Sequence, residues 1–215
     1  MGKSIEKISF VSRDYDNFAR RLRDNLKALA MLLERGDFGI GPGSFGAELE
    51  MYIIDENGNA LGKNLEIQQM LDNPQLTLEL NRFNLEYNLT PFPIVDRPFS
   101  ASENELLAAL KQIRSAASEL RGRIVPVGIL PTLRARDFNE HTMTDVPRYH
   151  ALANRLKDDR GGLFRVNIRG LDELTLETAE ITLEGANTSF QAHYRVSPEN
   201  YADTFNAIQL VTPLV

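Results

Sequence analysis

The chain of 215 residues is 42% apolar and 25% charged, contains no cysteine and carries a formal net charge of -6. This composition excludes a disordered chain, and the lack of cysteine excludes disulfides, thiolate zinc sites, iron-sulfur clusters and a cysteine nucleophile, so any metal must be held by oxygen or imidazole ligands. The acidic balance argues against general nucleic-acid or anionic-membrane binding, because phosphate contact needs clustered cations. No apolar run of about 18 residues could span a bilayer and no signal-peptide core is recognisable, so we expect a cytoplasmic protein.

Apolar residues at gaps of three and four, together with capping signals, predict four helices near residues 15–35, 102–121, 147–156 and 198–215. In the second of these, Ser102 and Glu105 form a capping box at the start and Gly122 marks the end. The fourth helix begins at Ser197-Pro198 and reaches the last residue without a terminating signal, so we expect it to be cut.

Between the helices, seven segments alternate apolar and polar residues with the period of two that is typical of half-buried strands. These segments are residues 45–54, 76–80, 83–89, 123–129, 163–168, 173–178 and 188–196. Regular alternation of strand and helix is absent, so we expect an α+β fold in which helices pack on one face of a largely antiparallel sheet. No linker or repeat divides the chain, and a single domain spanning residues 1–215 is therefore predicted.

Four glutamates are the first candidates for chemistry. Glu48 and Glu50 lie two residues apart, about 7 Å along one face of a strand. Glu79 and Glu86 lie on the polar faces of the next two segments, which carry no lysine. If these strands share one sheet, the carboxylates converge, and hard cations such as Mg²⁺ prefer carboxylate oxygens. The alternative is a solvated antiparallel face, which also favours Glu, Asn and Thr.

The last predicted strand places Gln191, His193 and Arg195 on one face. Imidazole and amide oxygens can act as ligands, and a guanidinium can clamp phosphate. The competing interpretation of the same pattern is a surface strand whose polar side chains are hydrogen-bonded to water or neighbouring residues and bind no ligand. His141 and His150 lack such an arrangement.

In collinear order, these motifs resemble the N-terminal part of the type 2 glutamate-cysteine ligase family, a glutamine-synthetase-like group of carboxylate-amine ligases. The resemblance spans roughly residues 45–215. The matching motifs are Gly46-x-Glu48-x-Glu50, Glu79 with Glu86 and Thr90-Pro91, Gly128 with Pro131, Arg148-Tyr149, and Gln191-x-His193 followed by Pro198.

The resemblance implies ATP-dependent amide formation through an acyl phosphate, with a glutamate-like carboxylate and an amine such as cysteine as substrates, as in glutathione biosynthesis. It further implies that Glu48, Glu50, Glu79 and Glu86 are Mg²⁺ ligands, with Gln191 and His193 near the metal and nucleotide. Arg148 would contact the substrate carboxylate or phosphate, although an arginine at a helix start can equally form an exposed salt bridge.

Members of the family continue into a second half that supplies further contacts. We therefore expect this chain to be an N-terminal portion that is inactive alone unless the missing half or another subunit completes the site. Two other hypotheses remain: a non-catalytic interaction or oligomerisation domain that keeps the fold, and a hydrolase that uses paired carboxylates as acid and base. Clustered glutamates favour a metal over the hydrolase.

Overall fold

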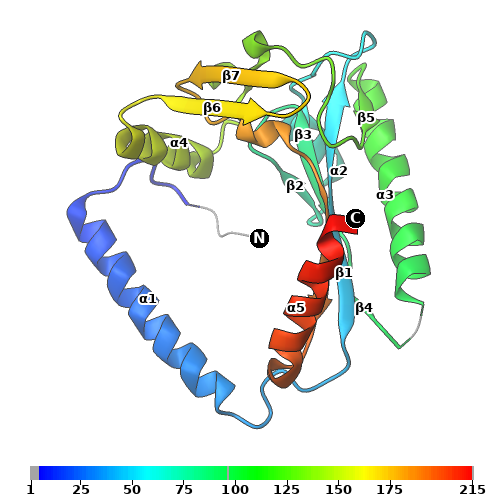
Figure 1. The fold of residues 1–215 in the computed structure, drawn as a ribbon. Coiled ribbons are helices and arrows are strands. Elements are labelled where there is room, and N and C mark those ends of the chain that lie inside the picture. The colour runs from blue at the N-terminus through cyan, green and yellow to red at the C-terminus, as the bar shows by residue number, and fades with distance from the viewer. Residues whose placement is uncertain (1–4, 96, 215) are drawn as a thin grey trace. The chain divides into compact units, whose positions relative to one another are not determined.

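The computed structural model describes residues 5–95 and 97–214, which group into two compact units. The first unit comprises Glu48–Leu89 and Glu105–Gln191 together with the described residues up to Ser9. The second comprises Phe10–Ala47, Thr90–Asn104 and the described residues from Ala192 onward. Helices and antiparallel strands follow one another along the chain (Figure 1), so the α+β prediction is confirmed. The prediction of a single domain stays a prediction.

A six-stranded sheet is built around one long strand, β1. Its members are β1 (Ser44–Ile54), β2 (Leu76–Leu78), β3 (Asn84–Asn88), β4 (Phe92–Pro93), β5 (Arg123–Val125) and β8 (Phe190–Arg195). The strand β1 pairs with β3, β4 and β5 in antiparallel fashion, and β2 pairs with β3 in the same way. Three of the polar-faced segments predicted from the sequence, β1, β2 and β3, are therefore neighbours in one sheet.

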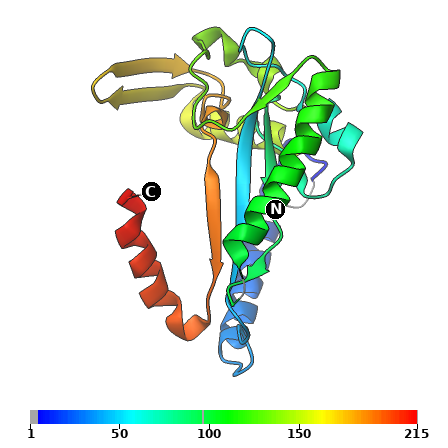
Figure 2. The same cartoon turned by 90° about the vertical axis from the view of Figure 1, so that its right-hand side faces the viewer.

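One face of this sheet forms the main core of the first unit. Met51 and Ile53 of β1 and Leu85 of β3 are fully buried there. The helix α3 (Pro98–Glu119) lies along the sheet (Figure 2) and contributes buried residues such as Ile113. Because side chains alternate along a strand, this packing leaves Glu48 and Glu50 on the other face.

The helix α3 begins earlier than its capping box predicted. Its first residue is Pro98, so Ser102 lies inside the helix, 6% exposed, and its hydroxyl has no hydrogen-bond partner among the described residues. A proline at the first helical position has a backbone angle that already suits a helix and gives up no needed amide donor, which explains the earlier start. The predicted N-cap role of Ser102 was wrong.

The end of α3 also differs from the prediction. The left-handed residue is Arg121, with φ of 58°, while the Gly122 amide bonds to the Ala117 carbonyl at 2.8 Å in a Schellman-type arrangement. Gly122 is instead closely packed: a Cβ there would lie 3.1 Å from Leu61 Cδ2 and 3.2 Å from the Ala117 oxygen, so these neighbours would have to move slightly to admit a side chain.

Because a left-handed conformation is costly for a residue with a Cβ, Arg121→Gly is expected to stabilise the protein by about 0.5–1 kcal/mol. Urea unfolding followed by circular dichroism measures this change. The matched substitution Arg123→Gly, in the strand β5 that follows, should destabilise the protein instead. A loss of stability in Arg121→Gly would contradict the assignment of this helix end.

The remaining elements agree largely with the predictions. They are α1 (Ser12–Leu33), α2 (Asn64–Leu71), α4 (Pro147–Arg160), α5 (Tyr201–Val211), the hairpin strands β6 (Phe164–Arg169) and β7 (Glu173–Thr178), and the short 3-10 turns Ala135–Asp137, Glu140–Thr142, Glu184–Ala186, Pro198–Asn200 and Thr212–Leu214. The helix α2 and the short strand β4 were not predicted. Among the described residues, no helix is long and apolar enough to cross a membrane.

Candidate functional site

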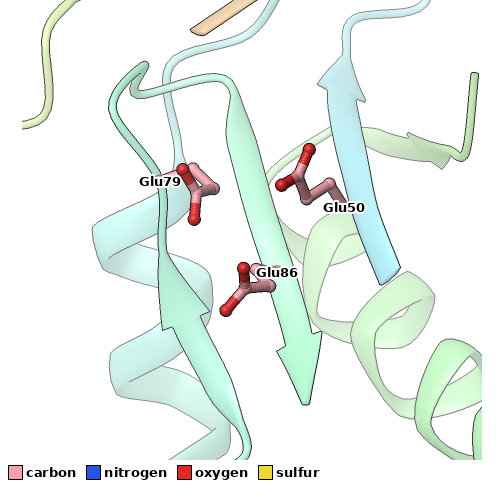
Figure 3. A group of neighbouring side chains, drawn as sticks. All are labelled: Glu50, Glu79 and Glu86. Atoms are coloured by element: carbon pink, nitrogen blue, oxygen red, sulfur yellow. The ribbon is translucent and has the colours of Figure 1, made fainter. Parts of the chain in front are cut away.

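Three of the four predicted glutamates come together on the polar face of the sheet. Glu50 on β1 is the cross-strand partner of Glu86 on β3, and Glu79 follows directly after the end of β2. Each offers a carboxylate oxygen, and these oxygens all lie within 4.8 Å of one another. Figure 3 shows the three side chains side by side. The antiparallel register therefore gathers residues that are 29 and 36 positions from Glu50 in the sequence.

Hydrogen bonds orient two of these carboxylates. Glu86 accepts from the Thr77 hydroxyl and from the Asn88 amide, each at 2.7 Å. Glu50 accepts from the Ser189 backbone amide at 2.8 Å and from the Gln191 side-chain amide at 3.2 Å. All of these donors are neutral, so they hold the carboxylates in place without cancelling their charge.

Glu79 is the electrostatically unusual member of the group. Burial, followed by the charges of Glu86 and Glu50, raises the pKa of Glu79 to about 7, while the Leu80 amide and the Arg148 guanidinium act in the opposite direction. The three carboxylates thus cannot all be ionised at low cost unless a proton or a cation joins them.

The backbone around Glu79 is held from the segment that leads into α4. The Leu78 carbonyl accepts from Arg148 Nη2 at 2.7 Å and from the Tyr149 hydroxyl at 2.9 Å. The Thr144 hydroxyl donates to the Glu79 carbonyl at 2.5 Å, and the Thr144 amide donates to the Leu80 carbonyl at 2.8 Å. Three consecutive carbonyls are therefore fixed, that of the last residue of β2 and the next two, where strand pairing ends.

Tyr149 and Arg148 also interact with each other. The guanidinium lies over the Tyr149 ring at 4.5 Å and donates to its hydroxyl. Burial, followed by the charge of Glu79, raises the pKa of Tyr149 to about 12, so its hydroxyl stays protonated and remains a donor to the Leu78 carbonyl.

This group of carboxylates fits a hard divalent cation. Glu50, Glu79 and Glu86 offer oxygen ligands from rigid strands or from a firmly held backbone, and Mg²⁺ binds through a few carboxylates while keeping waters or phosphate oxygens in its other positions. Burial, followed by the charges of Glu86 and Glu50, raises the pKa of Glu79, and a cation bound to the group would oppose both effects.

The other predicted site residues lie in different positions. Glu48 is on the same face of β1, opposite Asn88, but outside the group of three. Gln191 donates a hydrogen bond to Glu50, and its expected role near a metal and nucleotide stays a prediction. His193 is exposed and belongs to the second unit. The guanidinium of Arg148 binds the Leu78 carbonyl, so in this structure it supports the backbone of Glu79.

Sequence reasoning missed the contribution of Thr144 and of the Ser189 amide. Thr144 is fully buried and lies 65 residues from Glu79, and no periodicity or motif connects the two. The Ser189 contact comes from a backbone amide, which leaves no trace in residue identity. The position of Thr77 could be predicted from the sequence, because Thr77 and Glu79 lie on the same polar face of their alternating segment.

Taken together, the fold and site define an α+β protein with a carboxylate group suited to a divalent cation. The model of the family described as glutamate-cysteine ligase family 2 (GCS2) matches residues 44–179. The chain belongs to this family. Its suspected resemblance to carboxylate-amine ligases of the glutamate-cysteine ligase type is thereby confirmed. The match includes Glu48, the three clustered glutamates and Arg148, and it ends before Gln191 and His193. Searches among curated proteins and among solved structures returned no match.

Proposed function

We propose that the protein takes part in ATP- and Mg²⁺-dependent formation of an amide bond between a glutamate-like carboxylate and an amine such as cysteine. The observation that carries the proposal is the group formed by Glu50, Glu79 and Glu86 inside the region that the family matches. With cysteine as the amine, the reaction would belong to glutathione biosynthesis.

The proposed reaction proceeds in two steps, phosphorylation of the carboxylate and displacement of phosphate by the amine. A substrate carboxylate oxygen attacks the γ-phosphorus of ATP, so that the new O–P bond forms as the bond to ADP breaks. The amine nitrogen then attacks the carbonyl carbon of the acyl phosphate; the C–N bond forms, the C–O bond to phosphate breaks, and the amine loses a proton. Both steps bring several anions together, and catalysis depends mainly on positioning and charge neutralisation.

Different residues of the chain would have different roles in this reaction. Glu50, Glu79 and Glu86 would hold Mg²⁺, which when bound neutralises phosphate oxygens. Glu48 would support them from the same strand face. Gln191 would keep Glu50 oriented, a contact present in this structure, and His193 would lie toward the nucleotide.

Arg148 has two proposed roles. Its bond to the Leu78 carbonyl holds the chain at Glu79, and its charge lies close enough to Glu79 to affect that carboxylate. A role toward the substrate carboxylate or phosphate stays a prediction. The expectation that these 215 residues alone do not complete turnover also stays a prediction, and an assay for phosphate release from ATP with Mg²⁺, glutamate and cysteine tests it.

Calorimetric titration with Mg²⁺-ATP tests the metal assignment. Glu50→Gln keeps the shape of the side chain but removes a ligand charge, and we expect the affinity for Mg²⁺-ATP to fall by about tenfold or more. Glu56→Gln, in the exposed turn after β1, is the matched control and should bind as the unaltered chain does.

Two results would overturn the assignment. Equal Mg²⁺-ATP affinity in the unaltered chain and in Glu50→Gln would show that the three carboxylates do not hold the metal. An activity that is indifferent to EDTA would favour a carboxylate hydrolase over a ligase.

A further inference from the structure

An apolar pocket of about 590 Å³ lies in the first unit, outside the group of carboxylates. Its walls are residues 129–138, the hairpin β6–β7 and residues 180–187. Its volume falls within the range of about 300–1,000 Å³ that is typical of small-molecule sites, and its lining is dominated by Ile, Leu, Val and Phe side chains.

The hairpin β6–β7 supplies one wall because its two faces differ. Val166 and Leu176 are direct cross-strand partners and both line the pocket. The next pair along the ladder, Asn167 with Thr175, lies on the opposite face and outside the pocket lining. An isolated two-stranded hairpin is marginally stable in water, so its apolar face needs something to cover it.

Three connections within the first unit link the walls of the pocket to the segments that carry the carboxylates. The Tyr52 hydroxyl, two residues along β1 from Glu50, donates to the carbonyl of Ala186, which lines the pocket. The Ser189 amide that binds Glu50 is two residues, at most about 7 Å, from Asn187 of the same wall.

The third connection starts from Glu79. Its neighbour Leu80 packs in one apolar cluster with Ile181, which also lines the pocket. The apolar wall is thus connected to the segments that carry both Glu50 and Glu79.

We propose that this pocket binds a large apolar or aromatic group of the amine substrate. This inference rests on the proposed ligase function and narrows its amine, given there as one such as cysteine, to a bulkier one. The amine is the better occupant of the two substrates for a physical reason. It reacts as a neutral nitrogen, whereas the carboxylate substrate gains negative charge that an apolar wall disfavours. Water exclusion beside the reacting carbon also protects an acyl phosphate from hydrolysis.

Calorimetry on the 215-residue chain, without nucleotide or metal, tests the pocket separately from the metal site. The probes are 2-phenylethylamine and ethylamine, which share the amino group and differ in the aromatic ring. We expect phenylethylamine to bind about tenfold or more tightly than ethylamine.

Two variants on opposite walls, Leu176→Gln and Ile129→Gln, should each weaken phenylethylamine binding by about tenfold. Ile129 is 58% exposed, so its substitution leaves the fold intact even if the hairpin tolerates Leu176→Gln poorly. Thr175→Gln, on the far face of the hairpin, is the matched control and should bind as the unaltered chain does.

The outcomes separate the two proposals. In one outcome, phenylethylamine binds equally well to the unaltered chain and to Glu50→Gln while Glu50→Gln leaves Mg²⁺-ATP affinity unchanged. That result would support the pocket proposal and contradict the metal assignment. Equal affinity for both amines, or unchanged binding in both pocket variants, overturns the pocket proposal. Loss of a dimer in Leu176→Gln, measured by light scattering without any amine binding, would assign the apolar wall to a second copy of the chain and would likewise overturn it.

Discussion

Replacing Glu79 by Gln is expected to stabilise the metal-free protein at pH 8 and at the same time to remove most of its Mg²⁺ binding. The pKa of Glu79 is raised from 4.5 to about 7 in the folded chain. Between these two pH values the folded state holds a proton that the unfolded state has released, so the free energy of unfolding falls as pH rises through this window.

The expected size of the effect follows from the same linkage. A change of one unit in pKa corresponds to about 1.4 kcal/mol of unfolding free energy. Because Glu79 is partly exposed, the effect is smaller than its whole pKa change implies, and we expect the Gln variant to be more stable by about 2–3 kcal/mol at pH 8. Below about pH 4.5 the two proteins should be nearly equally stable. Glutamine cannot ionise, and the variant therefore shows a flatter dependence of stability on pH.

Urea unfolding in EDTA at pH 4.5 and pH 8, followed by titration with Mg²⁺, measures both halves of this prediction. Glu56→Gln again serves as the control, because an exposed glutamate in a turn should change neither quantity. If Glu79→Gln were no more stable than the unaltered chain at pH 8, burial and repulsion from the neighbouring carboxylates would not be destabilising the ionised form of Glu79. If it kept full Mg²⁺ affinity, Glu79 would not be a ligand.

Replacing Thr144 by Val is expected to lower both stability and Mg²⁺ affinity, although the change lies outside the group of carboxylates. The Thr144 hydroxyl donates to the Glu79 carbonyl and accepts from Asn64 Nδ2 at 2.8 Å. Valine has the same shape but leaves both groups without this partner in a fully buried position. A loss of about 1–3 kcal/mol in stability follows from the unpaired carbonyl.

The metal readout distinguishes positioning from simple packing. If Thr144 holds the backbone of Glu79 in place, Thr144→Val weakens Mg²⁺ binding by roughly tenfold, in the range typical of residues that orient metal ligands. Thr144→Ser retains the hydroxyl and should restore the metal affinity even if the lost methyl group costs stability. Equal metal affinity in the Val and Ser variants would show that Thr144 is structural only.

Strand alternation allowed much of the candidate site to be predicted. The period of two in residues 45–54 and 83–89 already placed Glu50 and Glu86 on polar faces, because burial of Met51 and Leu85 forces their neighbours outward. The helices near residues 15–35 and 147–156 were predicted for a similar reason, since a stripe of apolar residues with the helical period needs no knowledge of its partner.

The α3 boundaries show where such reasoning fails. A capping box at Ser102 satisfies local rules, but the helix starts at Pro98 and Ser102 is buried inside it. The short strand β4 and the helix α2 carry weak local signals and depend on the segments that they pack or pair with. Local propensity is a weak prior that tertiary context overrides.

The residue pattern by itself determined the class of fold, the polar faces and the glutamates that carry the family resemblance, because alternation and residue chemistry are local properties. Only the tertiary structure decided that Glu50, Glu79 and Glu86 form the group while Glu48 lies outside it, since this depends on strand register and on where β2 ends. It also decided that Arg148, Tyr149 and Thr144 hold the chain at Glu79. Their hydrogen bonds join segments 65 to 71 residues apart, and such contacts exist only once the chain has folded.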